Sequence, residues 1–362
     1  MQLRERTEDS GTSAVSRRSL LRTGTGMAAA AVSGGLSVFA AQPASADVDA
    51  SRRFVLGGNG DKFFVNIPLH QPYWAMQSFA FDHVFGHIYA VQTKVGSANG
   101  DLWVTRTDMS GHILGAMAIH GFDHGSNIAI EPDTYGSPYM WVPGDWRKLH
   151  PEDPDDKPNS HTIARFKYAD GGDLSYADSA VRKFIIHLSD FRDCPRPAID
   201  PYNNRILLRY MGTTSPWRLA LFDLPSVLSK GFVDDVPLPR LAARELPSNS
   251  DIGLTADDDF QGVTAYGQYA YLLYGGPPEK TTDPAKPSYL VTLDMNDEAK
   301  TVKDIFQTHA GDTTLPGREP QGIAIYRAPS GPQLAFGFSS KYDSNDPAQF
   351  RSSIFYKTDL TW

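Results

Sequence analysis

The chain has 362 residues, with 34 Lys and Arg against 42 Asp and Glu, which gives a formal net charge of −8. An acidic chain with scattered arginines lacks the basic surface that a duplex nucleic-acid binder needs, so we expect no nucleic-acid partner. Its 31 Gly and 26 Pro residues are spread along the sequence and long helical periods are scarce, which favours a protein of short strands and turns.

The N-terminal segment has the layout of an export signal. Arg17-Arg18 ends a polar start, an uncharged Ala- and Gly-rich run follows over 23–41, and Ala44-Ser45-Ala46 offers small side chains to a signal peptidase. Paired arginines before a weakly apolar run are typical of twin-arginine export. We therefore predict a secreted, extracellular protein that is exported by the twin-arginine pathway.

This layout divides the chain into a signal peptide over 1–46, a linker over 47–61 and one domain over 62–362. No apolar stretch reaches the about 20 residues of a membrane-spanning helix, so we expect no membrane span. The only cysteine is Cys194, which excludes an intrachain disulfide and is expected to be a small buried residue. We expect a monomer without a cofactor.

Residues 77–120 indicate how the domain is built. Four apolar or alternating segments are separated by turns with Gly or Asn, which tolerate the positive φ of hairpin turns. These segments are 77–82, 87–93, 101–108 and 112–120. Four consecutive hairpin-linked strands form one blade of a β-propeller. A short helix is predicted at 225–230, with Pro225 in its first turn and Gly231 just after its end.

A repeated segment predicts the number of blades. Gln77, Gln261 and Gln321 each begin an alternating apolar strand, and the last two starts are 60 residues apart. The first two are 184 residues apart, about three such periods, and degenerate copies begin at Ser126 and Arg196. Five units predict an all-β fold, a five-bladed β-propeller of four-stranded antiparallel blades.

The last blade lacks a strand in this scheme. Only three strands remain from residue 321 onwards, and the segment 62–69 is a strand without a blade. If this segment completes the last blade, the ring closes and an unpaired sheet edge is hidden. We therefore expect 62–69 to pair with a C-terminal strand.

The sequence at this point resembles a known family. The segments that carry the resemblance are Gln77–Asp82, Gly100–Gly115, Gly121–Glu131, Arg318–Tyr326, Phe336–Ser340 and Ile354–Lys357. They are similar to the propeller of teichoic-acid-biosynthesis-C-like proteins and phage receptor-binding (baseplate) proteins. The resemblance covers nearly all of 62–360. It implies a five-bladed propeller, which the phage members use to recognise cell-wall glycopolymers, although this chain has an export leader and no stem or trimerisation segment.

The starts of the inner strands surround one mouth of a propeller's central channel, so residues there are the candidate binding residues. Amides suit sugar hydroxyls, and a guanidinium suits a carboxylate or phosphate. The candidate ligand-binding residues are Gln77, His124, Asn127, Glu131, Arg196, Gln261, Arg318, Glu319 and Gln321. The repeated glutamines equally fit a structural role between blades, and His124 fits a packed, hydrogen-bonded side chain.

Other residues leave further alternatives open. Asp82, Asp200 and Glu131 end equivalent inner strands, where capping of a turn is the expected role. Trp141 is expected in the core, and the long polar loop 143–160 is a second place for binding. No second His lies at ligand spacing from the first candidate, so we expect no metal site.

Three functions are compatible with these residues, and the sequence leaves open whether the protein is an enzyme. The first is a non-catalytic binder of a cell-wall or extracellular glycopolymer, teichoic-acid-like or another polysaccharide. The alternative is a polysaccharide-cleaving lyase or glycosidase at the channel mouth, and a scaffold for protein partners is a third. No catalytic motif favours an enzyme. For the binder, Arg196→Ala or Arg318→Ala is expected to weaken retention on wall polymer without unfolding the protein.

Overall fold

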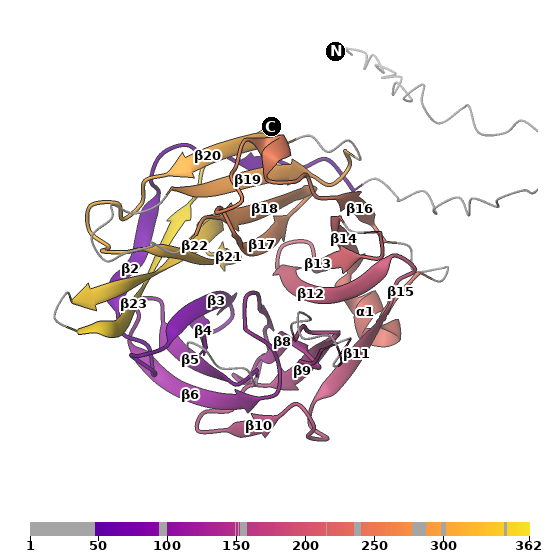
Figure 1. The fold of residues 1–362 in the computed structure, drawn as a ribbon, viewed down its shortest axis with the longest axis horizontal. Helices are drawn as coiled ribbons and strands as arrows, with labels where there is room; N and C mark the ends of the chain where they lie inside the picture. The colour runs from indigo at the N-terminus through magenta and orange to yellow at the C-terminus, as the bar shows by residue number, and fades with distance from the viewer. Residues whose placement is uncertain are drawn as a thin grey trace, which may run out of the picture. The chain divides into compact units, whose positions relative to one another are not determined.

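A computed structural model of the chain describes residues 48–93, 100–148, 150, 152, 158–214, 216–234, 240–276, 287–297, 302–343 and 346–362. Their strands form five antiparallel sheets in a ring, which is the five-bladed propeller expected from the repeat (Figure 1). Among these residues no helix is long and apolar enough to cross a membrane. The leader predicted over 1–46 lies outside the described residues.

Each blade has four antiparallel strands, which follow one another from the centre of the ring outwards. Blade 1 consists of β3 (Ala75–Asp82), β4 (His87–Thr93), β5 (Leu102–Asp108) and β6 (Ile113–His120). Blade 2 consists of β7 (Ala129–Glu131), β8 (Tyr139–Gly144), β9 (Thr162–Lys167) and β11 (Arg182–His187). Blade 3 consists of β12 (Phe191–Asp200), β13 (Arg205–Gly212), β14 (Trp217–Asp223) and β16 (Ala242–Glu245). Blade 4 consists of β17 (Phe260–Tyr266), β18 (Tyr269–Tyr274), β19 (Ser288–Asp294) and β20 (Asp304–Thr308), after the 3-10 helix η1 (Ser250–Ile252). Blade 5 consists of β21 (Glu319–Ala328), β22 (Gly331–Asp343), β23 (Asp346–Lys357) and β2 (Asp61–Ile67).

Short strands from the following blade cover the outer edges of blades 1 and 2. β10 (Asp173–Ser175) pairs in parallel with β6, and β15 (Phe232–Val233) pairs in parallel with β11. An uncovered edge presents unpaired N–H and C=O groups, so these segments protect the blades against pairing with other chains. The predicted helix is α1 (Leu224–Lys230), where the Asp223 side chain accepts a hydrogen bond from a backbone N–H of the first turn.

The N-terminal part of the domain closes the ring, as expected for residues 62–69. β2 pairs antiparallel with β23 and gives blade 5 its fourth strand. The preceding segment, expected to be a linker, contains β1 (Arg53–Phe54), which pairs with β24 (Leu360–Thr361). Phe54 is fully buried there, so this segment also packs against the propeller.

The hydrophobic core lies between neighbouring blades. Leu207 of blade 3, for example, belongs to one buried cluster with Val263 and Leu272 of blade 4, and four further clusters fill the other interfaces. Side chains of a β-strand point alternately to its two faces, so each strand contributes to the layers on both sides of its blade. Trp141 lies in such a layer and is fully buried, as expected.

The glycines of the repeated Gln-Gly pairs allow neighbouring inner strands to approach closely. A Cβ on Gly322 would lie 2.8 Å from the Ser78 Cα, and a Cβ on Gly262 would lie 3.1 Å from the Gly322 Cα. Gly322 also has a φ of 80°, which other residues rarely adopt. In blade 1 the corresponding residue, Ser78, donates a hydrogen bond of 2.6 Å to the Gly125 carbonyl beside blade 2. The repeat therefore reflects the joining of consecutive blades.

Candidate functional site

The inner strands begin on one face of the ring, which we call the mouth face. In four blades a β-bulge interrupts the pairing of the inner strand near this face, at residue 77 in blade 1, 194–195 in blade 3, 261 in blade 4 and 321–322 in blade 5. In blade 2 the inner strand begins only at Ala129, so the predicted start at 126 lies in the loop that leads into it. Bulges re-aim side chains, which suits a binding face.

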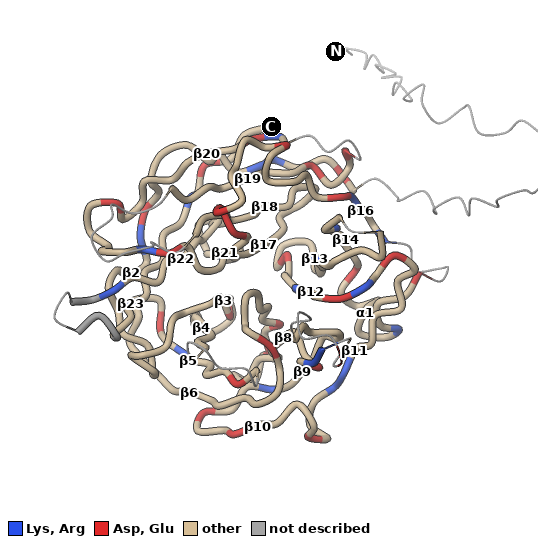
Figure 2. Tube along the Cα trace, in the orientation of Figure 1, with Lys and Arg blue, Asp and Glu red and all other residues tan. Residues whose placement is uncertain are grey.

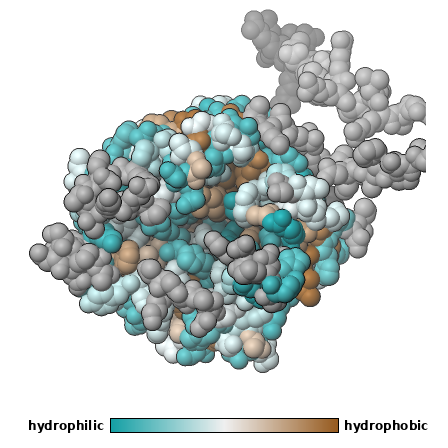
Figure 3. Space-filling view, in the orientation of Figure 1, coloured by the Kyte–Doolittle hydropathy of each residue, from teal (hydrophilic) through white to brown (hydrophobic). Residues whose placement is uncertain are grey.

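Below the mouth, mainly aliphatic and aromatic side chains line the channel. Side chains from all five blades line a cavity there, among them Phe81, Ile130, Ile199, Thr264 and Ile325. Figure 3 shows apolar surface close to the centre of the ring, on the side of β14, β17 and β18. These side chains include no carboxylate for acid–base chemistry, and Thr264 carries their one hydroxyl, so we expect polar recognition mainly at the mouth.

Asn127, an expected ligand-binding residue, joins three blades. Its side chain is buried, its Nδ2 donates to the Pro197 carbonyl of blade 3 at 2.6 Å, and its Oδ1 accepts from the Val263 N–H of blade 4 at 2.9 Å. Both groups of the amide are therefore engaged inside the protein, and Asn127 stabilises the ring at the mouth.

We expect Asn127→Ala to lower the free energy of unfolding by about 1–3 kcal/mol, because two buried backbone groups lose their hydrogen-bond partner. Thermal or urea unfolding measures this loss. Ser126→Ala, at the partly exposed neighbouring position, serves as the control and should change stability little. Equal stability of both variants and the wild type would show that Asn127 does not join the blades.

Arg196 is neutralised within the protein. It is 9% exposed, forms an ion pair of 2.7 Å with the fully buried Asp123, and donates to the Ser160 hydroxyl at 2.8 Å. The exposed His124 lies nearby, and its partial removal from water lowers the pKa of its imidazole, which favours the neutral form at pH 7. Of these three charged or titratable groups, His124 is the one accessible from solvent.

Arg318 and Glu131 are likewise engaged with other parts of the chain. Arg318 is 1% exposed, donates to two backbone carbonyls and forms an ion pair with Asp312. Glu131 lies at the far end of its inner strand and accepts two hydrogen bonds of 2.8 Å from Arg165. We expected that replacing Arg318 would weaken binding without unfolding the protein. This expectation needs correction, because Arg318 holds backbone carbonyls and Asp312 inside the protein, so its loss also lowers stability.

The three repeated glutamines differ in their availability. Gln321 is 3% exposed and its side chain bonds to Glu319, whereas Gln261 donates to the Gly275 carbonyl at 2.9 Å. Gln77 is partly exposed and has no hydrogen-bond partner among the residues that the structure describes. Gln77 is thus the glutamine whose amide can receive a ligand without losing an internal bond.

Carboxylates at the inner strands have two roles. Asp82 and Asp200 cap turns on the face opposite the mouth, as expected, by accepting hydrogen bonds from backbone N–H groups two and three residues later. At the mouth, burial raises the pKa of Glu319, and the charge of Asp259 raises it further. Asp259 ends an acidic run that precedes β17, whereas elsewhere acidic and basic residues are interspersed around the ring (Figure 2).

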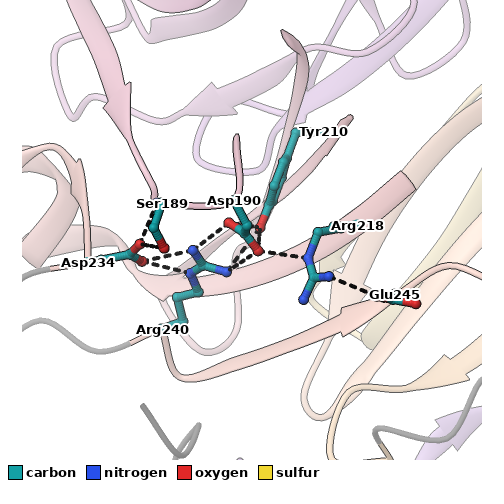
Figure 4. A network of polar contacts seen from close by, with 7 residues as sticks. All are labelled: Ser189, Asp190, Tyr210, Arg218, Asp234, Arg240 and Glu245. Atoms are coloured by element: carbon teal, nitrogen blue, oxygen red, sulfur yellow. Dashed lines mark hydrogen bonds and ion pairs between the residues drawn. The ribbon is translucent and has the colours of Figure 1, made fainter. Parts of the chain in front are cut away.

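A polar network that the sequence did not predict lies at the mouth end of blade 3 (Figure 4). Asp190 accepts hydrogen bonds from Arg240 at 2.6 and 2.8 Å and from the Tyr210 hydroxyl at 3.0 Å, and it forms an ion pair of 2.7 Å with Arg218. Burial alone would raise the pKa of Asp190, but the hydrogen bond and charge of Arg240, with the charge of Arg218, hold it below its usual range. Both arginines are therefore paired.

The polar loop 143–160 is described only in part, because residues 149, 151 and 153–157 lie outside the described residues. Its two ends are joined by a bridge between Arg147 and Asn159. Within the described part of the chain, no group of three or more His, Cys, Asp and Glu side chains is arranged to hold a metal ion.

A ring of five four-stranded blades around a central channel defines a five-bladed β-propeller. The chain matches the family of phage 5-bladed beta propeller receptor binding platform domains over residues 75–340. It belongs to this family, and the match confirms the predicted phage receptor-binding propeller. No curated protein matches the sequence.

Solved structures share the fold at low sequence identity. The chain is similar to the tail fiber of Staphylococcus aureus phage P68, with 16% identity and a TM-score of 0.55 over 85% of this chain and 52% of that chain. It thus spans about half the length of that fiber. Weaker similarities are to an alpha-L-arabinofuranosidase from Lactobacillus brevis (9% identity, TM-score 0.43, 80% of this chain and 93% of that chain) and an exo-beta-1,3-galactanase from Clostridium thermocellum (12%, 0.41, 83% and 64%).

Proposed function

We propose that this protein binds a hydroxyl-rich glycopolymer of a cell wall or cell surface at its mouth face, without cleaving it. The observation that carries the proposal is the start of β3, where the ring of Tyr73, just before the strand, is exposed and the amide of Gln77, four residues later within the strand, is partly exposed. Tyr73 is 54% exposed, and aromatic faces stack on the C–H surfaces of sugars while amides bond their hydroxyls.

Membership of the receptor-binding platform family supports this role, because such domains are named for receptor recognition. The predicted leader supports a secreted protein, which would bring the mouth into contact with extracellular polymers. The internal pairing of Asp123 and Asp190 with arginines supports binding over catalysis, because these carboxylates are not free for acid–base chemistry.

Retention of the purified protein on a glycan array and on immobilised wall polymers tests the proposal. Tyr73→Ala should weaken retention roughly tenfold, as expected for a lost stacking contact. Tyr135→Ala is the matched control, since Tyr135 is 89% exposed in the turn after β7, at the opposite face. Equal effects of both variants, or no retention of the wild type on any polymer, would contradict binding at the mouth.

The pair Glu319 and Asp259 favours glycoside cleavage as a second candidate. A glycosidase uses a carboxyl group of raised pKa as its acid, and burial, with the charge of Asp259, raises the pKa of Glu319. The appearance of reducing ends from a retained polymer, and its loss in Glu319→Gln, would favour the enzyme. Unchanged polymer after long incubation with the wild type would favour the binder.

The raised pKa of Glu319 also has a consequence for stability. The folded protein holds this proton more tightly than the unfolded chain, so stability falls as pH rises from the unfolded value of about 4.3 through the folded value. We expect Glu319→Gln to raise the unfolding temperature relative to the wild type at pH 7 and to change it little at pH 4. Melting curves at both pH values measure this difference, and an equal shift at both would contradict the raised pKa.

A further inference from the structure

Arg209 is a buried guanidinium without a counter-charge. It lies in β13 and is 5% exposed, yet among the described residues it has neither an ion pair nor a hydrogen bond. Its Nε is fully buried without a hydrogen-bond partner among these residues. Burial lowers the pKa of Arg209 to about 9. Because burying an unpaired charge opposes folding, a purely structural role does not explain this residue.

The repeat shows that the fold does not need an arginine at this position. In the four blades with a bulge, we compare one position of the second strand: the residue that pairs with the first inner-strand residue after the bulge. In three of these blades this residue is apolar. These residues are Val91 in blade 1, Leu273 in blade 4 and Phe336 in blade 5, with Arg209 in blade 3. Arg209 is therefore an exception within the repeat.

Two aromatic rings fix the guanidinium of Arg209. Its central carbon lies 3.6 Å from the ring centre of Trp217 in β14 and 3.6 Å from that of Phe260 at the start of β17. Both rings are partly exposed and pack against the buried cluster between blades 3 and 4. Stacking leaves only the edge of the guanidinium for hydrogen bonds, and this planar fork matches the two oxygens of a carboxylate or phosphate.

The neighbouring arginines do not compete for such a ligand. Arg196, directly opposite Arg209 in the sheet, is paired with Asp123. Arg218 and Arg240 are paired with Asp190, and Arg192 is paired with Asp193. Of the five arginines 192, 196, 209, 218 and 240, Arg209 is thus the one without a carboxylate partner among the described residues.

We infer that Arg209 binds an oxyanion, the carboxylate or phosphate group of an anionic glycopolymer, at the mouth between blades 3 and 4. This inference rests on the proposed function. It adds that the polymer is negatively charged and that Arg209 binds its charged groups. A bound anion supplies the missing counter-charge, and the two rings pre-organise the guanidinium, which reduces the entropy lost on binding.

Thermal unfolding with three probes of matched length tests the inference: poly(glycerol phosphate), polygalacturonate and neutral dextran. At saturating concentration one of the anionic probes should raise the midpoint of the wild type by about 2–4 °C, and dextran should raise it less. The probe that acts identifies phosphate or carboxylate as the source. Arg209→Leu should lose this shift, whereas Arg205→Leu removes the same charge from the other end of β13 and should keep it.

Four outcomes would overturn the inference: no shift with either anionic probe, an equal shift with dextran, a shift retained in Arg209→Leu, or unfolding of Arg209→Leu without ligand. The last would show that Arg209 has a structural role.

Titration by NMR gives an independent readout. The chemical shift of the Arg209 Nε–H group should change when the active probe is added to the wild type. Retention of Arg209→Leu on a neutral glycan would leave the proposed function intact, and loss of all retention by the wild type would contradict the proposed function itself.

Discussion

Replacement of Phe64 by alanine is expected to lower the free energy of unfolding by about 3–5 kcal/mol. Phe64 is 5% exposed in β2, pairs with Ile354 of β23 and belongs to the cluster between blades 5 and 1. Its removal leaves a cavity at the place where the ring closes. Urea or thermal unfolding measures the effect.

Lys62→Ala is the control for this variant, because Lys62 is exposed in the same strand. It should change stability little. If both variants unfold at the same denaturant concentration as the wild type, β2 does not close the ring, and blade 5 has a different fourth strand.

Arg318→Leu is expected to lower the free energy of unfolding by about 3 kcal/mol, because two carbonyls and Asp312 lose a buried partner. The same substitution at Arg209 is expected to leave stability unchanged or to raise it, since Arg209 has no hydrogen bond or ion pair among the described residues to lose and leucine can pack against the same two rings. Two buried arginines thus respond in opposite directions. Melting curves of the two variants side by side test this contrast, and equal destabilisation would contradict it.

The fold could be predicted because its determinants are local. Gly and Asn mark the hairpin turns, and alternating apolar residues mark the strands, so β3 to β6 lie within two residues of the predicted segments at either end. The closure by 62–69 followed from counting strands in the last blade. Blade 2 begins later than predicted, because residues 126–128 do not pair and Asn127 instead bonds to blades 3 and 4.

The roles of the candidate site residues could not be predicted, because their partners are distant in the sequence. Asn127 bonds to residues 70 and 136 positions away. The partner of Arg196 is the buried Asp123, and no sequence pattern links the two. Arg209 was missed because it stands in an otherwise apolar strand, although comparison of the second strands across the repeat would have revealed it.

The pairing of arginines around blade 3 illustrates the same limit. Asp190, Arg218 and Arg240 are separated by tens of residues, and only the return of β13, β14 and β16 to one end of the blade brings them together. Such a network determines which arginine side chains are left without a carboxylate partner and can bind an anionic ligand. Charge patterns along the sequence do not contain this information, since they do not record pairing.

A hydrogen-exchange footprint of the complex tests the central claim, binding of a glycan at the mouth, most directly. With a polymer selected by the retention assay, protection is expected in peptides that contain residues 73–78, 123–127 and 260–262, at the starts of inner strands. Peptides that contain the opposite turns, 83–86 and 201–204, should exchange as in the free protein. Protection confined to those opposite turns would contradict binding at the mouth.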